Sequence, residues 1–140
     1  MINTIMMCLA LNIYFEARNQ PLSGQIAVTQ VVLNRVADSR YPNKVCDVVY
    51  QAKKTNSGKI IINKCQFSWF CDGKSDKPKD LDAFRWATYV ALNVIYGSYK
   101  DNTFGATHYH SKKVNPKWAL PQNKTVEIGD HLLFKWQNEY

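Results

Sequence analysis

The sequence predicts a single α+β domain that is mainly helical and carries short strands toward its C-terminal end. A chain of 140 residues is long enough for one compact core and too short for two ordinary domains. Apolar residues repeat at helical spacings in three long segments before residue 97, and strand-like pieces follow that point. No internal repeat or linker divides residues 1–140, so we treat them as one domain.

The first helix is predicted to run from the N-terminus to the Arg18-Asn19-Gln20-Pro21 stretch, which ends it. Glu16 continues the apolar stripe of this helix, so its carboxylate lies at the end of a buried face and is partly desolvated. The segment lacks a basic region and a small-residue cleavage site, so we interpret it as a core helix and not as a signal peptide. The stripe consists of Ile2, Met6, Leu9 and Ile13.

Two further helices are expected in the first half of the chain. Ser23 is expected to cap a buried central helix that runs to about Ala37, although its β-branched residues leave a strand as the competing interpretation. The Tyr41-Pro42-Asn43 stretch turns the chain, and Asn43 is expected to cap a short helix around residues 45–49.

The second half of the chain contains more turn signals. Residues 53–59 are polar and predict a loop, and Ile60–Ile62 can form a short strand. A long helix is predicted to begin near Asp80 or Asp82 and to end at Gly97. Strand-like pieces follow at residues 107–110, 126–128 and 132–136.

The composition limits the classes of binding partner but does not identify one. A net charge of +7 and a pI of about 9.3 favour polyanions such as nucleic acid, anionic membranes or bacterial wall polymers. The lysines are spread along the chain, so we expect no specific nucleic-acid partner. Separately, we expect the protein to be a monomer. No apolar stretch is long enough to cross a membrane.

The cysteine spacings match no CxxC metal or redox motif. Cys8 lies in the apolar pattern of the first helix and is expected to be a buried thiol. Cys46, Cys65 and Cys71 could include one disulfide or could all be reduced.

Glu16 is the strongest catalytic candidate, because it is the one glutamate inside a strong helix pattern. Burial against Tyr14 or Phe15 would raise its pKa toward neutrality, which is the property that a general acid needs. The structural alternative is an ion pair with Arg18 or Arg35 at the helix end.

A second candidate cluster is the aromatic and polar segment Gln66-Phe67-Ser68-Trp69. Sugar rings stack on aromatic faces, while their hydroxyl groups bind amide and hydroxyl side chains. A core strand with a polar outer face would show the same alternation, so both interpretations stay open.

A third cluster is His108-Tyr109-His110, in which a strand would place both histidines on one face and Tyr109 on the other. Two histidines at this spacing can hold zinc, but the further ligand candidates His131, Cys65 and Cys71 show no recognisable spacing. We therefore assign no metal and no cofactor, and we favour structural or substrate-contacting histidines.

Taken in order, these segments resemble the cell-wall hydrolase family of spore-cortex-lytic enzymes, the SleB/CwlJ type. The resemblance covers nearly the whole chain. Its matching stretches are residues 9–18, 24–28, 32–36, 41–43, 45–51, 65–69 and 106–110.

The resemblance implies a lysozyme-like α+β fold, mainly helical with a small antiparallel β region. It also implies cleavage of peptidoglycan between N-acetylmuramic acid and N-acetylglucosamine, commonly by a lytic transglycosylase, with Glu16 as catalytic acid and base. Asn34 and Arg35 are expected to tie the central helix to neighbouring loops. The substrate contacts expected around Glu16 are Tyr14, Gln66, Phe67, Ser68, Trp69, His108, Tyr109 and His110.

Because no signal peptide or wall-binding domain is recognised, we expect a protein made in the cytoplasm that acts at the wall. A phage endolysin released through a holin, or a mature bacterial fragment, would suit this expectation. One alternative is a wall amidase or peptidase that uses zinc on His108, His110 and His131, or a cysteine–histidine pair. Another is a non-catalytic module that binds wall polymer.

Overall fold

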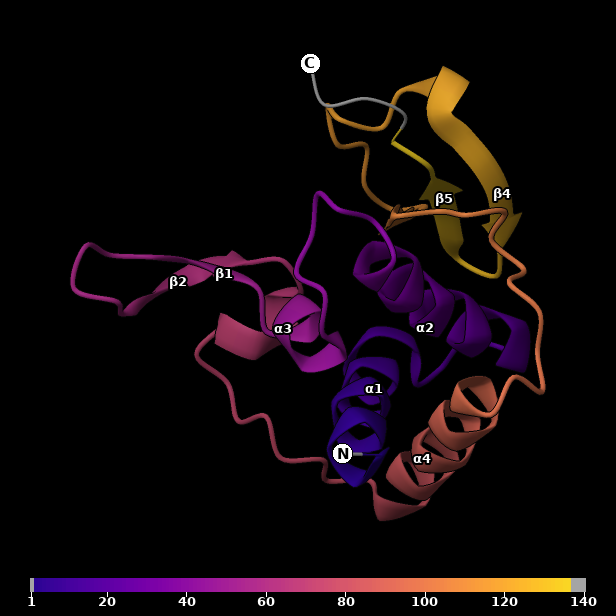
Figure 1. Ribbon diagram of the computed structural model, residues 1–140, viewed down its shortest axis with the longest axis horizontal. Coiled ribbons are helices and arrows are strands. Elements are labelled where there is room, and N and C mark those ends of the chain that lie inside the picture. Colours follow the sequence, from indigo (N-terminus) through magenta and orange to yellow (C-terminus); the bar gives the residue numbers. More distant parts are fainter. Residues whose placement is uncertain (1, 137–140) are drawn as a thin grey trace.

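The computed structural model describes residues 2–136 and confirms an α+β fold that is mainly helical with small antiparallel sheets (Figure 1). The helices are α1 (Ile2–Ala17), α2 (Leu22–Val36), α3 (Val45–Val49) and α4 (Leu81–Ile95), with 3-10 turns η1 (Ser68–Cys71) and η2 (Pro121–Asn123). The strands are β1 (Ala52–Lys54), β2 (Ile60–Cys65), β3 (His108–Ser111), β4 (Lys124–Ile128) and β5 (His131–Phe134).

Helix α1 is the centre of the helical layer and packs against α2, α3 and α4 (Figure 1). The predicted stripe is confirmed at Leu9 and Ile13, which have no exposed surface and share one core cluster with Val32 and Val90 of the neighbouring helices. Met6 is partly buried against this cluster, and the Ile2 side chain lies outside the described part of the structure. Each large aliphatic side chain buried in this way contributes about 1.5–3 kcal/mol. No helix within residues 2–136 combines the length and the apolar character needed to cross a membrane.

The sheet β3-β5-β4 is antiparallel and packs one face on α2. Tyr109 lies opposite Leu133, and Leu133 is fully buried against Ala27 and Val31 of α2. The alternation predicted for the histidine segment is therefore confirmed, since His108 and His110 lie on the other face of the sheet.

Strands β1 and β2 form a hairpin that extends away from the helical layer (Figure 1). The prediction of a loop over residues 53–59 is wrong for Lys53 and Lys54, which belong to β1. Both faces of this hairpin are largely exposed, so its sequence shows no apolar alternation that could reveal the first strand. The turn at Asn56-Ser57-Gly58 is confirmed.

Of the helix caps predicted from the sequence, Asp80 is confirmed, whereas Ser23 and Asn43 are wrong. Asp80 caps α4, because its carboxylate accepts the backbone N–H of Ala83 at 3.0 Å. Ser23 is not a cap, because α2 begins one residue earlier, at Leu22, after Pro21. Asn43 is not a cap either, since Lys44 precedes α3 and contributes no side-chain hydrogen bond.

All four cysteines form disulfides, so the expectation of a Cys8 thiol is wrong. Cys8 bonds to Cys46 because α3 packs on α1 and brings the two Cα atoms to 5.5 Å. Cys65 bonds to Cys71 and thereby fixes the end of β2 to η1. Because residues 68–71 form this 3-10 turn, the core-strand interpretation of the aromatic segment is also wrong.

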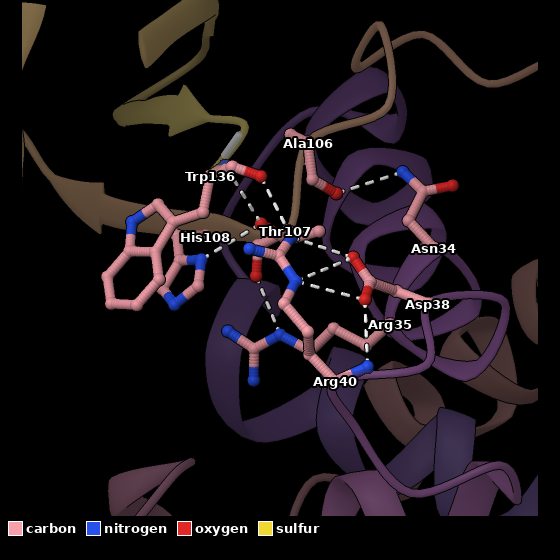
Figure 2. Close-up of polar contacts among 8 residues, drawn as sticks. All are labelled: Asn34, Arg35, Asp38, Arg40, Ala106, Thr107, His108 and Trp136. Atoms are coloured by element: carbon pink, nitrogen blue, oxygen red, sulfur yellow. Dashed lines mark hydrogen bonds and ion pairs between the residues drawn. The ribbon is translucent and has the colours of Figure 1, made fainter. Parts of the chain in front are cut away.

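Two neighbouring residues of α2 attach the helix to the segment that enters β3, as Figure 2 shows and as predicted. The Asn34 amide donates to the carbonyl oxygen of Ala106 at 2.9 Å and also contacts Asp101 and Thr103. The Arg35 Nε donates to the carbonyl oxygen of Thr107 at 2.6 Å. These bonds fix where β3 begins relative to α2.

Replacing Asn34 by alanine is expected to lower the free energy of unfolding by about 1–3 kcal/mol, because the carbonyl oxygen of the fully buried Ala106 loses its donor. Urea denaturation of the Asn34→Ala variant measures the loss. The control variant, Asn115→Ala, changes an exposed loop residue and is expected to stay within about 0.5 kcal/mol of the parent chain. Equal stability of the two variants would contradict the assignment.

Candidate active site

Glu16 lies in the last turn of α1, where the helix meets the Tyr109 face of the sheet. The Tyr109 hydroxyl donates a hydrogen bond to Glu16 Oε1 at 2.6 Å. Burial raises the pKa of Glu16 above its ordinary value of 4.5, while the Tyr109 hydrogen bond and the charge of Arg35 lower it, and burial has the larger effect. The carboxyl group therefore holds its proton more tightly than an exposed glutamate does.

The alternative of an ion pair at the helix end is not what the structure shows. Within residues 2–136, Glu16 has no ion-pair partner. Arg18 is exposed, and its guanidinium lies 4.4 Å from the centre of the Tyr14 ring instead. Arg35 acts on Glu16 through its charge and not through a direct contact.

Arg35 supplies a buried positive charge beside the carboxyl group. Only 2% of its surface is exposed, and its guanidinium lies between the rings of Tyr41 and Phe67, at 5.3 and 5.5 Å from their centres. When the Gln66 amide is oriented with its oxygen toward Arg35, that oxygen accepts from both terminal nitrogens at 3.2 and 3.3 Å. Arg35 is thus both a tie to β3 and a wall of the site.

Tyr109 stays neutral and remains a hydrogen-bond donor. Burial raises its pKa well above the ordinary value, and the neighbouring Glu16 carboxylate raises it further. Asn12, one turn before Glu16 on α1, accepts the indole N–H of Trp69 at 2.9 Å, and its side chain partly offsets the rise in the pKa of Tyr109. Asn12 therefore positions Trp69 and also influences Tyr109.

A cavity of about 160 Å³ opens in front of the Glu16 carboxyl group. A second hollow of about 190 Å³ lies along residues 14–20, and Glu16 belongs to the lining of both. Glu16 is therefore the one residue common to the linings of these two hollows. The first cavity is lined by Glu16, Arg35, Gln66, Phe67, His108, Tyr109 and Trp118.

The structure places four of the eight expected substrate contacts in this cavity: Gln66, Phe67, His108 and Tyr109. The other four do not line it. Trp69 is buried and stacks on Phe15 with ring centres 5.0 Å apart, and Ser68 is exposed outside the cavity. His110 packs against Phe134 and Trp118.

Tyr14 borders the second hollow, but its hydroxyl has a structural partner. It accepts the backbone N–H groups of Lys79 at 3.1 Å and Asp80 at 3.0 Å, at the start of α4. The segment before α4 is thereby fixed to α1, and the hydroxyl is occupied.

His108 is a packed neutral side chain. Burial lowers its pKa to about 3, with further lowering by the charges of Arg35 and Arg40. Its ring stacks on Trp136 at 3.9 Å, and its Nδ1 shares a hydrogen bond of 3.0 Å with the Thr107 hydroxyl (Figure 2). It therefore shapes the cavity wall and does not carry a proton to substrate at neutral pH.

Sequence reasoning missed Asn12 and Trp118 as parts of the site and gave Arg35 only a structural role. Asn12 carried a usable signal, because it is a polar residue one helical turn from Glu16 and the residues from 5 to 15 are otherwise apolar. Trp118 lies in a loop, and no periodic pattern could have placed it against the cavity.

The geometry required by the zinc and thiol alternatives is not formed. His131 lies opposite Ser111 and so faces the Tyr109 side of the sheet, away from His108 and His110. Cys65 and Cys71 are bonded to each other, so neither offers a thiolate. In the part of the chain that the structure describes, no three residues of metal-binding type come together.

Three comparisons with known proteins agree on one family. The sequence model described as Cell Wall Hydrolase matches residues 19–134, a range that begins after Glu16. A spore cortex-lytic enzyme of Oceanobacillus iheyensis is 38% identical over 131 residues, and one of Bacillus cereus is 28% identical over 124 residues. Both alignments cover 88% of this chain.

Two solved structures share the fold. The catalytic domain of the Bacillus cereus SleB protein has a TM-score of 0.65 at 25% identity, over 95% of this chain and 91% of that one. The catalytic domain of the germination-specific lytic transglycosylase SleB from Bacillus anthracis has a TM-score of 0.66 at 25% identity, over 94% and 93%.

The chain spans 41% of the Bacillus cereus relative and 38% of the Oceanobacillus iheyensis relative. These relatives correct the predicted localisation. The expectation that the protein is made in the cytoplasm and released through a phage holin is wrong, because the relatives are spore cortex-lytic enzymes. The endolysin interpretation itself stays a prediction.

The raised pKa of Glu16 predicts a pH-dependent gain in stability when the residue becomes glutamine. A carboxyl group with a raised folded-state pKa stabilises the fold fully below its unfolded value of 4.5, and that contribution is lost as pH rises through the folded value. Glu16→Gln cannot ionise and can still accept the Tyr109 hydrogen bond. Its unfolding free energy relative to the parent should therefore increase above pH 4.5, by about 1.4 kcal/mol for each pKa unit of the shift.

Urea denaturation at several pH values between 4 and 8 measures this difference. Glu127→Gln is the matched control, because Glu127 is exposed and pairs with Lys112 at 3.2 Å. The control should show no such increase. A difference for Glu16→Gln that stays constant across the series would contradict the burial of an ionisable group.

Proposed function

The chain belongs to the cell wall hydrolase family, and from that premise we propose that it cleaves peptidoglycan glycan strands as a lytic transglycosylase, with Glu16 as the catalytic acid and base. The bond cut is the one between N-acetylmuramic acid and N-acetylglucosamine. The observation that carries the proposal is the partly buried Glu16 carboxyl group, which has a raised pKa, accepts the Tyr109 hydrogen bond and belongs to the lining of two hollows. One of the similar solved structures is itself described as a lytic transglycosylase.

The first step needs a protonated carboxyl group. Glu16 donates its proton to the glycosidic oxygen, the bond from that oxygen to C1 of muramic acid breaks, and the glucosamine leaves as an alcohol. Burial raises the pKa of Glu16 and so favours the protonated form that this step needs. Positive charge then develops at C1, and the new Glu16 carboxylate lies beside it.

The second step needs the same group as a base. The Glu16 carboxylate accepts the proton of the muramic 6-hydroxyl, and the hydroxyl oxygen bonds to C1 to close a 1,6-anhydro ring. The Tyr109 hydrogen bond and the Arg35 charge stabilise the carboxylate between the two steps. Glu16 ends the cycle protonated, so no net proton is consumed.

The cavity composition favours this route over hydrolysis with two carboxyl groups. Hydrolases of that type place a second carboxylate about 5–9.5 Å from the acid. Among the described residues that line the cavity, Glu16 is the one carboxyl group. A substrate that supplies its own nucleophile removes the need for a second one.

Glu16→Gln is expected to lower the release of soluble fragments from purified peptidoglycan by at least about 10²-fold, because the amide cannot donate a proton to the leaving oxygen. Mass spectrometry of the fragments from the parent chain should show 1,6-anhydromuramic ends. Glu127→Gln serves as the control and should release the same fragments at the parental rate.

Two results would overturn this mechanism. Reducing muramic ends in place of anhydro ends would show that water attacks C1, and the enzyme would be a hydrolase. Undiminished release by Glu16→Gln would show that another group donates the proton.

A further inference from the structure

A larger hollow adjoins the Glu16 cavity at the base of the β1–β2 hairpin. It measures about 410 Å³, and we call it the hairpin hollow. Gln66 lines both this hollow and the Glu16 cavity, so the two share a wall. The hairpin hollow is lined by Gln51, Ala52, Lys53, Asn63, Lys64, Cys65 and Gln66.

The hairpin hollow is positively charged and contains no compensating acid. Lys53 and Lys64 both line it, and neither forms an ion pair with any residue between positions 2 and 136. Residues 48–71 contain four lysines and no aspartate or glutamate. A concave surface with one sign of charge concentrates oppositely charged groups of a ligand.

The walls of the hairpin hollow are held in place. The Gln66 backbone N–H donates to the carbonyl oxygen of Gln51 at 2.8 Å, which joins the two ends of the hairpin. The Cys65–Cys71 disulfide fixes the end of β2 to η1. Asn63 adopts a φ of 65°, an unusual backbone conformation next to Lys64. These contacts fix the backbone that carries the exposed Lys53 and Lys64 side chains.

We propose that the hairpin hollow binds carboxylate groups of the stem peptide that muramic acid carries, and this inference rests on the proposed function. A muramic acid held against Glu16 bears its peptide on the lactyl group, and the peptide must leave the cavity along one wall. Gln66 forms the wall shared with the hairpin hollow, and the free carboxylates of the peptide would meet Lys53 and Lys64 there. The enzyme then prefers glycan that still carries stem peptides.

The test compares two forms of the same glycan strands, one with stem peptides and one from which an amidase has removed them. The parent chain should have the lower KM on the peptide-bearing form. In the Lys53→Ala/Lys64→Ala double variant, the ratio of the two KM values should change by about tenfold, which corresponds to about 1.4 kcal/mol of binding. The matched control, Lys59→Ala/Lys113→Ala, removes the same charge from exposed residues outside the hollow and should keep the parental ratio.

A parental KM ratio in the Lys53→Ala/Lys64→Ala variant would overturn the proposal. So would an equal change of the ratio in the control, because it would show a general effect of net charge. A third adverse result is competition by soluble poly(glycerol phosphate) but not by a free stem peptide, since the hollow would then be a site for phosphate polymers.

A binding measurement separates this inference from the proposed activity. A soluble disaccharide–tripeptide, added to the Glu16→Gln chain, should shift the amide NMR signals of Lys53, Lys64 and Gln66 more than the disaccharide alone does. Equal shifts with the two ligands would overturn the peptide site, whether or not the parent chain cuts glycan. Peptide-dependent shifts, together with a parent chain that releases no fragments from peptidoglycan, would uphold the site and reject the proposed activity.

Discussion

Burial of one carboxyl group at the end of an apolar helix is the constraint on which the site depends. Water solvates a carboxylate far better than a protein interior does, so α1 can end with Glu16 only if the group keeps its proton or finds donors. The Tyr109 hydroxyl is such a donor, at 2.6 Å. The balance between burial and this hydrogen bond gives Glu16 the properties of an acid in one step and a base in the next.

The rest of the fold holds Glu16 and Tyr109 in position relative to each other. Helix α2 contacts both the helical layer and the sheet, because its apolar face packs on α1 while Val31 and Ala27 support the sheet that carries Tyr109. Its C-terminal residues Asn34 and Arg35 fix the backbone at Ala106 and Thr107, directly before β3. The helical layer and the sheet are thus joined next to the site.

The parts of the structure with strong periodicity could be predicted from the sequence. The stripe of α1 placed Glu16 correctly, and the strand alternation placed Tyr109 on the opposite face from its neighbouring histidines. Part of β2 was predicted but β1 was not, because exposed strands carry no apolar pattern. The disulfides and the buried position of Arg35 depend on how distant segments pack, which spacing along the chain does not reveal.

The central claim concerns the protonation of one side chain, so titration of that side chain tests it most directly. The carboxyl carbon of Glu16, followed by ¹³C NMR in the parent chain as pH is varied, should report a pKa clearly above the ordinary 4.5. A Glu16 midpoint at or below 4.5 would contradict the account, because the group would then have lost its proton before substrate arrives.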